Sequence, residues 1–225
     1  MPSARILLGV ALLSFGFAPA ARAQDANSAF VVTYIEVAPA TKSDAVGLLR
    51  ELGVASRKDP SSLRFEVVQR IDRPNHFAVL EVWKDQKAQE AHVAATKEFR
   101  ERLQPLLSAP YDERPHGALA VGPGGTAGKN AIYAVTHVDI IPPKKEDGIA
   151  ITKQLADPSR KESGSFRYDV LQQSSRPNHM TLVEVWSGQK ALEKHETSAH
   201  IKKYRAALLA MSGSLYDQRL YKALR

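Results

Sequence analysis

The chain has 225 residues, of which 44% are hydrophobic and 24% charged, the balance of a folded protein rather than a disordered one. It contains no cysteine, which excludes disulfide bonds, thiolate metal sites, iron–sulfur clusters and cysteine nucleophiles. The formal net charge is +7, and the length allows one large domain or two small ones.

The first segment has the pattern of an export signal. Arg5 precedes an apolar run over residues 6–18, and the small–x–small sequence Ala21-Arg22-Ala23 follows it. We therefore expect residues 1–23 to be a secretory signal peptide, whose cleavage removes two arginines and lowers the net charge from +7 to +5. A retained membrane anchor is the alternative, but the run is shorter than the roughly 20 residues that span a bilayer. No later run is long and apolar enough to cross a membrane, so the predicted location is periplasmic or secreted, without membrane attachment after cleavage.

The rest of the chain is a tandem repeat of one unit. The tetrapeptide Arg73-Pro74-Asn75-His76 recurs as Arg176-Pro177-Asn178-His179, and residues 63–92 share 15 identities in 30 positions with residues 166–195. Such repetition identifies a duplicated structural unit. We expect two similar domains, at residues 29–121 and 131–225, joined by a flexible Gly-rich linker at residues 122–130.

Each unit has the element order β-α-β-β-α-β. In chain order, the first unit is predicted to contain a strand at 30–37, a helix at about 42–54, strands at 63–71 and 76–84, a helix at about 86–107 and a closing strand around 118–121. A strand at 132–140 opens the second unit in the same way. This order predicts an α+β fold in which an antiparallel sheet carries both helices on one face, the ferredoxin-like plan.

That plan leaves the other face of each sheet uncovered. The first strand is apolar on both faces, with Phe30, Val32 and Tyr34 on one and Val31, Ile35 and Val37 on the other. A domain of this size also has a limited core of its own. We therefore expect the two ferredoxin-like units to pack sheet to sheet as a pseudo-dimeric α/β barrel within one chain. Two independent domains are the alternative.

The third strand carries the candidate site. Its residues of one parity project to one side of the sheet, and they are Asn75, Phe77, Val79, Glu81 and Trp83, with Asn178, Met180, Leu182, Glu184 and Trp186 as counterparts. His92 and His195 each lie nine residues beyond the tryptophan. If the following helix packs on that side, asparagine, tryptophan and histidine line one pocket for a small molecule.

The residue types suit an aromatic ligand. A tryptophan offers a surface for stacking, an asparagine amide can hold a phenol or carbonyl oxygen, and a histidine can act as a base. The alternatives are a core role for the tryptophans, a turn role for the asparagines and a surface or core role for the histidines. Glu81 and Glu184 are expected in ion pairs with Arg64, Arg167 or the arginine of a Tyr-Asp-x-Arg motif. That motif, at residues 111–114 and 216–219, is expected to hold the closing strands.

The pattern Pro-Asn-His-Phe-x-x-x-Glu-Val-Trp, followed by Lys-Ala-x-Glu-x-His, resembles the antibiotic biosynthesis monooxygenase family of dimeric α/β barrels. The second unit adds His195-Glu-Thr-Ser-Ala-His200, close to the helix signature of that family, whereas the first has Lys97 where His200 aligns. The resemblance implies catalytic pocket positions at Asn75, Trp83, His92, Asn178, Trp186 and His195. We also expect Tyr34, His137 and His200 to contribute to binding the ligand.

The resemblance implies a monooxygenase that oxidises a small phenol or quinol with O2 and needs no cofactor. The substrate anion would reduce oxygen directly, and the second unit is expected to be the more active one because it keeps more of the signature. A non-catalytic exported protein that binds a small ligand is one alternative. Haem binding or breakdown is another, disfavoured because Thr33-Tyr34 and Thr136-His137 replace the asparagine of the haem-cleaving branch.

Other partners are less consistent with the sequence. His195 and His200 are five residues apart and would not share a face of one helix, so no metal site is expected. The positive charge is interleaved with acids along both units, which argues against nucleic acid. The expected partner is a small aromatic or quinol ligand, and a homo-oligomer of the fused pair is left open.

Overall fold

The computed structural model describes residues 27–224, so the predicted signal peptide at 1–23 lies outside the described residues. The first repeat contains β1 (Ala29–Glu36), η1 (Pro39–Thr41), α1 (Lys42–Ser56), β2 (Ser62–Arg70), β3 (His76–Trp83), α2 (Gln86–Ala95), α3 (Lys97–Leu103), η2 (Gln104–Leu106) and β4 (Asp112–Ala120). The second contains β5 (Ile132–Asp139), η3 (Pro142–Lys144), α4 (Lys145–Lys153), α5 (Ala156–Arg160), β6 (Ser165–Gln173), β7 (His179–Trp186), α6 (Gln189–Glu196), α7 (Ala199–Leu208) and β8 (Asp217–Ala223). The duplicated ferredoxin-like plan is confirmed.

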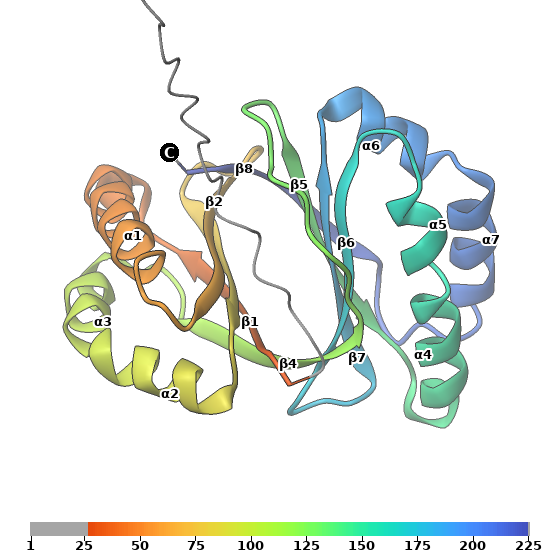
Figure 1. Cartoon of the computed structure of the whole chain (residues 1–225), viewed down its shortest axis with the longest axis horizontal. Helices are drawn as coiled ribbons and strands as arrows, with labels where there is room; N and C mark the ends of the chain where they lie inside the picture. The colour runs from red at the N-terminus through yellow and green to blue at the C-terminus, as the bar shows by residue number, and fades with distance from the viewer. Residues whose placement is uncertain (1–26, 225) are drawn as a thin grey trace, which may run out of the picture.

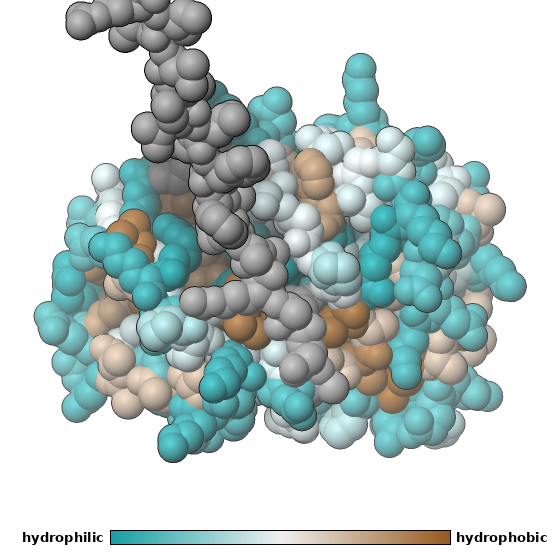
Figure 2. All heavy atoms as spheres, viewed as in Figure 1, coloured by the Kyte–Doolittle hydropathy of each residue, from teal (hydrophilic) through white to brown (hydrophobic). Residues whose placement is uncertain are grey.

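The two sheets close on each other. The strands form one barrel in the order β1-β3-β2-β8-β5-β7-β6-β4, and every neighbouring pair is antiparallel. Helices α1–α3 cover one sheet on the outside and α4–α7 cover the other (Figure 1). In this view, hydrophilic side chains cover most of the outer sides of the two helical layers (Figure 2). The predicted pseudo-dimeric barrel is therefore confirmed.

The closing strands are longer than predicted because each one joins the two repeats. Strand β4 pairs with β1 of its own repeat from Asp112 to His116, and then with β6 of the other repeat from His116 to Ala120. Strand β8 likewise pairs with β5 and then with β2. The Tyr-Asp-x-Arg motifs run into the first residues of these strands, where proline and charged residues obscure the alternation typical of a strand.

Three apolar cores follow from the alternation of the strands. Phe30, Val32 and Tyr34 of β1 lie in a cluster inside the barrel with Tyr133, Val135 and Leu171 of the second repeat. The other face of β1, with Ile35 and Val37, packs under the helices of the first repeat, and a third cluster lies under those of the second. Each fully buried large apolar side chain contributes about 1.5–3 kcal/mol. Both apolar faces of the strand are thus covered.

The long helix predicted at 86–107 is broken. Helix α2 ends at Ala95, α3 begins at Lys97, and Thr96 between them bonds its own hydroxyl to the carbonyl oxygen of His92 at 2.8 Å. The second repeat has a wider break at Thr197 and Ser198, and the backbone of Ser198 is extended. The periodicity of apolar residues continues across both breaks, so the helical pattern alone did not reveal them.

Candidate functional site

A tryptophan, a glutamate and a histidine form one cluster in the first repeat. The indole Nε1 of Trp83 donates to Oε2 of Glu81 at 2.8 Å, and its ring stacks on that of His92 with centroids 4.3 Å apart. His92 Nε2 lies 3.8 Å from the same carboxyl oxygen. Helix α2 therefore packs on the tryptophan side of the sheet, which is the condition on which the expected pocket depended.

The second repeat builds the same cluster and extends it. Trp186 Nε1 donates to Glu184 Oε2 at 2.9 Å, and the Trp186 and His195 ring centroids are 4.4 Å apart. His195 Nε2 lies 3.4 Å from Glu184 Oε2, while its Nδ1 lies 2.6 Å from Oε1 of Glu162. His200 also reaches Glu162 Oε1, at 3.0 Å. This extension gives the second repeat a chain of titratable groups that runs from the buried Glu184 and His195 to the partly exposed Glu162 and His200.

Burial sets the charge of these groups. It raises the pKa of Glu81 to about 7 and that of Glu184 to about 8, because a carboxylate loses hydration inside the protein. Burial lowers the pKa of His92 to about 4 and also lowers that of His195. The two carboxyl groups therefore titrate close to neutral pH, and His92 is uncharged there.

The expected ion pairs of these glutamates with arginine are wrong. Arg64 and Arg167 have the opposite parity to the helix-facing residues of β2 and β6, so they point away from Glu81 and Glu184. They instead cross between the repeats, Arg167 to Glu66 at 2.6 Å and Arg64 to Asp169 at 3.6 Å. The indole N–H groups and histidines take the place that arginine was expected to occupy.

The pocket predicted beneath each indole is filled by side chains. Trp83 and Trp186 are both 0% exposed. Phe65 and His92 pack against the first indole, and His195 against the second. An aromatic ligand would have to displace these side chains in order to stack on either indole.

The asparagines lie apart from the indoles. Asn75 Nδ2 donates to the carbonyl oxygen of Val37 at 2.9 Å, and Asn178 Nδ2 donates to that of Ile140 at 2.7 Å. Each therefore ties the turn before the third strand to the end of the first strand of its repeat. The asparagines therefore have the turn role that was the alternative to ligand binding.

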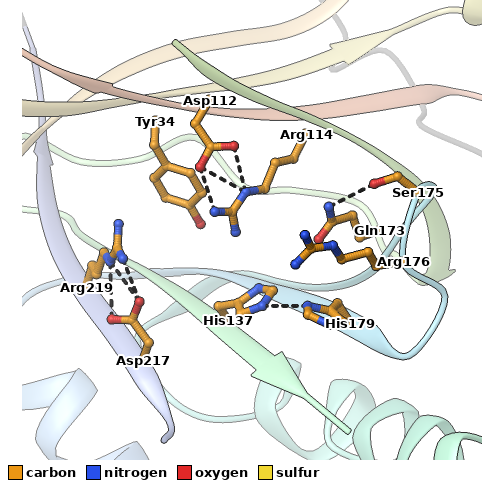
Figure 3. Close-up of a pocket in the computed structure, with 10 residues that line it drawn as sticks. All are labelled: Tyr34, Asp112, Arg114, His137, Gln173, Ser175, Arg176, His179, Asp217 and Arg219. Carbon is orange, nitrogen blue, oxygen red and sulfur yellow. Dashed lines mark hydrogen bonds and ion pairs between the residues drawn. The ribbon is translucent and has the colours of Figure 1, made fainter. Parts of the chain in front are cut away.

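A polar cavity opens on the barrel side of the sheets instead. It has a volume of about 290 Å³ and lies at the barrel end formed by the ends of β1 and β5 and the starts of β4 and β8. We call it the barrel-mouth pocket (Figure 3). Its lining residues come from both repeats: Tyr34, Asp112, Arg114, His137, Gln173, Ser175, Arg176, His179, Asp217 and Arg219. Two of the three predicted ligand-binding residues, Tyr34 and His137, are among them, whereas His200 is not.

Arginines dominate the charge of the barrel-mouth pocket. Arg114 and Arg219 flank the Tyr34 ring, with guanidinium carbons 4.9 and 5.1 Å from its centroid. Each is also held by an aspartate two residues earlier, at 2.6 and 2.7 Å. The exposed Arg176 is the third arginine of the lining. Three arginines against two aspartates leave the pocket positive, which suits an anionic oxygen.

A histidine pair lies across the pocket from Tyr34. His179 Nε2 is 3.3 Å from Oδ1 of Asp139, and His179 Nδ1 is 3.0 Å from Nε2 of His137. If Asp139 accepts from His179, then His179 Nδ1 is the acceptor for His137, and His137 keeps an unprotonated Nδ1. That Nδ1 is buried and has no hydrogen-bond partner among the described residues, so a substrate must displace neighbouring side chains slightly in order to reach it. Burial, together with the charge of Arg114, lowers the pKa of His137 to about 4, so the ring is neutral at pH 7.

The pocket breaks the symmetry of the duplication. Tyr34 and His137 occupy equivalent positions of β1 and β5, so the first repeat contributes a phenol where the second contributes an imidazole. Two of the three arginines of the pocket, Arg114 and Arg219, belong to the repeated Tyr-Asp-x-Arg motif, which the sequence assigned only to holding the closing strands. Their parity with the barrel-facing residues was the signal that could have found them.

The fold and these sites define a tandem ferredoxin-like barrel of the dimeric α/β-barrel class. Residues 28–108 and 131–207 both match the antibiotic biosynthesis monooxygenase family, and together they make up well over half of the chain. The chain therefore belongs to that family.

Two relatives of known sequence match parts of the chain. A protein of Bacillus subtilis named "Putative monooxygenase YcnE" is 26% identical over 75 residues, which are 33% of this chain and 79% of that protein. An uncharacterized protein of Synechocystis is 31% identical over 64 residues, which are 28% of this chain and 44% of that protein. The chain thus matches less than half the length of the Synechocystis relative.

Solved structures share the whole fold. A crystal structure described as a "Putative monooxygenase" from Fusobacterium nucleatum has a TM-score of 0.81 and 14% identity, covering 90% of this chain and 94% of that one. An anthrone oxidase-like protein has a TM-score of 0.66 and 12% identity, covering 88% and 92%. Identities this low support the fold alone. Among residues 27–224, no helix is both long and apolar enough to cross a membrane.

Proposed function

We propose that the protein is an exported monooxygenase that oxidises a small phenolic or quinol substrate with O2 in the barrel-mouth pocket, with the substrate itself supplying the electrons. Membership of the family supports a monooxygenase. The substrate class and the position of the reaction rest on the chemistry of this pocket, above all on the neutral His137–His179 pair facing a cluster of arginines.

The side chains of the pocket can assist substrate deprotonation. Guanidinium groups of Arg114, Arg176 and Arg219 stabilise a phenolate more than the neutral phenol, which lowers the pKa of the bound substrate. His137 takes the phenolic proton, and its contact with His179 disperses the resulting charge. The electron-rich anion then reduces O2, and the substrate supplies all four electrons. One oxygen atom forms a bond to a ring carbon whose C–H bond breaks, and the ring is oxidised to the quinone level. The ring hydrogen and the phenolic proton leave with the second oxygen atom as water.

In this proposal the six residues at the catalytic positions of the family have other tasks. Trp83, His92 and their counterparts anchor the helical layers on the sheets, and the two asparagines hold the turns before the third strands. The cavity of about 290 Å³ is close to the lower end of small-molecule sites, which favours a substrate of one or two rings.

Oxygen uptake tests the proposal. The protein is incubated with a panel of phenols and quinols in chelator-treated buffer, and dissolved O2 and product are measured together. His137→Gln, which keeps a polar side chain of similar reach, should lower kcat at least tenfold without altering the thermal unfolding midpoint. No uptake with any substrate, or an unchanged rate in the variant, would show that the reaction or its position is wrong.

Ligand binding without turnover is the second candidate. Both indoles are completely buried, so the tryptophans at the family's catalytic positions do not contact a ligand in the barrel-mouth pocket, which favours binding without catalysis. Anaerobic calorimetry with the same quinols separates the two functions. An enzyme and a binding protein would both bind the quinol, but only an enzyme then consumes O2 on aeration.

The filled space beside the indoles does not favour haem, and we expect no Soret band on titration with haemin.

The periplasmic or extracellular location rests on the predicted signal peptide. Mass spectrometry of the protein expressed with residues 1–23 should find Gln24 as its first residue in the exported fraction. A retained N-terminus in the cytoplasmic fraction would contradict export.

A further inference from the structure

The helix break in the second repeat brings together two histidines that a continuous helix would separate. Helix α6 ends at Glu196 and α7 begins at Ala199, and the extended Ser198 between them redirects the chain. The ring centroids of His195 and His200 are therefore only 5.8 Å apart. The expectation that two histidines five residues apart would not converge is wrong, because it assumed one unbroken helix.

Glu162, in the loop after α5, completes the group. Its Oε1 lies 2.6 Å from Nδ1 of His195 and 3.0 Å from Nε2 of His200, and the three atoms all lie within 4.8 Å of one another. Ligand atoms around a tetrahedral Zn²⁺ with bonds of about 2.0–2.1 Å lie about 3.3 Å apart. Shifts of roughly 1 Å or less in side-chain position would therefore give a chelating geometry. The hydroxyls of Ser159 and Ser198 lie near the same His200 nitrogen, at 3.4 and 3.3 Å.

We propose that Glu162, His195 and His200 bind one divalent transition-metal ion of the Zn²⁺ type. Two imidazoles and one carboxylate are a donor set that Zn²⁺ prefers, and three protein ligands leave coordination positions for water. The His195 side chain is 2% exposed, whereas those of Glu162 and His200 are 14% and 27% exposed. The site is therefore anchored inside the protein and open to the solvent on one side.

A hydrogen-bonded shell supports the buried ligand. Coordination through Nδ1 of His195 requires the ring proton on Nε2, and Oε2 of Glu184 lies 3.4 Å from that atom. The same oxygen accepts from Trp186 Nε1 at 2.9 Å, which fixes its position. Such a carboxylate behind a histidine ligand sets its tautomer and orientation, and its loss typically costs 10- to 100-fold in metal affinity.

The first repeat has the matching histidine without the site. Asp59 and Lys97 occupy the positions of Glu162 and His200. Asp59 bonds to Ser61, and the Lys97 side chain is 81% exposed beside Glu101. In residues 27–224 the group in the second repeat is the one cluster of three such side chains with this geometry. The stoichiometry should accordingly be one ion per chain.

Titration of the chelator-stripped protein with Zn²⁺ tests the proposal, using calorimetry and elemental analysis after dialysis. One equivalent should bind, and Glu162→Gln and His200→Ala should each weaken binding at least tenfold. Asp59→Asn and Lys97→Ala, at the equivalent positions, should leave the affinity unchanged. His195→Ala removes a buried ring and can impair folding, so the variants of the two more exposed ligands decide the test.

Fluorescence gives a second readout that reports position. Because the ring centroids of Trp186 and His195 are 4.4 Å apart, Cu²⁺ at this site should quench the emission of Trp186. The variant Trp83→Phe leaves Trp186 as the sole tryptophan. Quenching should disappear in His200→Ala but persist in Lys97→Ala. Absence of stoichiometric binding, or equal loss in the ligand and control variants, would overturn the proposal. The site is separate from the barrel-mouth pocket, so failure of oxygen uptake would leave this result standing.

Discussion

The guanidinium of Arg167 in the second repeat lies 2.6 Å from Oε2 of Glu66 in the first. Tyr133 donates to the other oxygen of Glu66 at 3.0 Å. Arg64 and Asp169 form the reciprocal pair between the repeats at 3.6 Å. Together these contacts join the repeats at the barrel end opposite the barrel-mouth pocket. Loss of one partner there would leave an unpaired charge buried between the two sheets.

Removing one partner of this contact should destabilise the barrel. The Arg167 side chain is 4% exposed, so Arg167→Met leaves Glu66 without its main partner and should lower the free energy of unfolding by about 3 kcal/mol. Urea denaturation measures the loss. Arg102→Met is the control, because its pair with Glu51 is exposed on both sides and should contribute less than about 1 kcal/mol. Similar values for both variants would contradict a buried bridge between the repeats.

The carboxyl group of Glu81 should make stability depend on pH. Burial raises its pKa from 4.5 to about 7, so the folded state holds the proton more tightly than the unfolded state does. The stabilisation is complete below pH 4.5 and is lost as the pH rises through about 7. Glu81→Gln keeps an acceptor for Trp83 but cannot titrate. The variant should therefore gain stability relative to wild type over this interval, by roughly 3 kcal/mol at most.

The nearby His92 also titrates in this range. Burial lowers the pKa of His92 from 6.5 to about 4, so its contribution has the opposite sign: it is present above pH 6.5 and is lost as the pH falls. Because His92 Nε2 lies 3.8 Å from Glu81 Oε2, the two groups are coupled, and the comparison is repeated in a His92→Gln background that removes this contribution. Denaturant titrations from about pH 4 to about pH 9 provide the curve, and a difference that does not change with pH would show that Glu81 titrates normally.

Arg176 should contribute to substrate binding in the barrel-mouth pocket. Because it is exposed, Arg176→Gln should raise KM for a phenolic substrate by roughly 2- to 5-fold, the size of one exposed charge interaction, with little change in kcat. Arg73→Gln is the matched control from the first repeat, since Arg73 aligns with Arg176 but does not line the pocket. Equal kinetics in both variants would place the substrate elsewhere.

The turn before β6 requires glycine at position 164, because the backbone there adopts a positive φ and leaves no room for a side chain. The φ of Gly164 is +90°, and an added Cβ would meet the Ser187 hydroxyl at 2.6 Å and Ala191 Cβ at 2.8 Å. Gly164→Ala should therefore cost about 1–3 kcal/mol of stability. Gly47→Ala, within helix α1 and with nothing within 4 Å of the new methyl, should instead stabilise the protein by up to about 1 kcal/mol. Thermal unfolding of both variants checks the opposite signs.

Much of the fold could be predicted because its signals are local or repeated. The duplication, the element order and the two apolar faces of the first strand were enough to imply two sheets packed face to face. The closing strands were underestimated, since Asp112, Pro115 and the neighbouring charges do not look like a strand until two other strands pair with them.

The candidate sites were predicted less completely. Alternation along the third strand places tryptophan and glutamate on one side of the sheet, and two of the expected ligand-binding residues, Tyr34 and His137, line one pocket. The arginines beside them were assigned only to holding a strand. Whether the space beside an indole is open or filled depends on side chains from other elements, such as Phe65, and no spacing along the chain records that.

Amino-acid order alone specifies the duplicated unit, the element order and the face on which each strand residue lies, because alternation and periodicity are properties of neighbouring residues. Other contacts arise only when the barrel folds: Arg167 with Glu66, Tyr34 with His137 in one cavity, and His200 with His195. Those contacts depend on the register between distant strands and on a two-residue interruption of a helix, both set by the packing of the whole barrel.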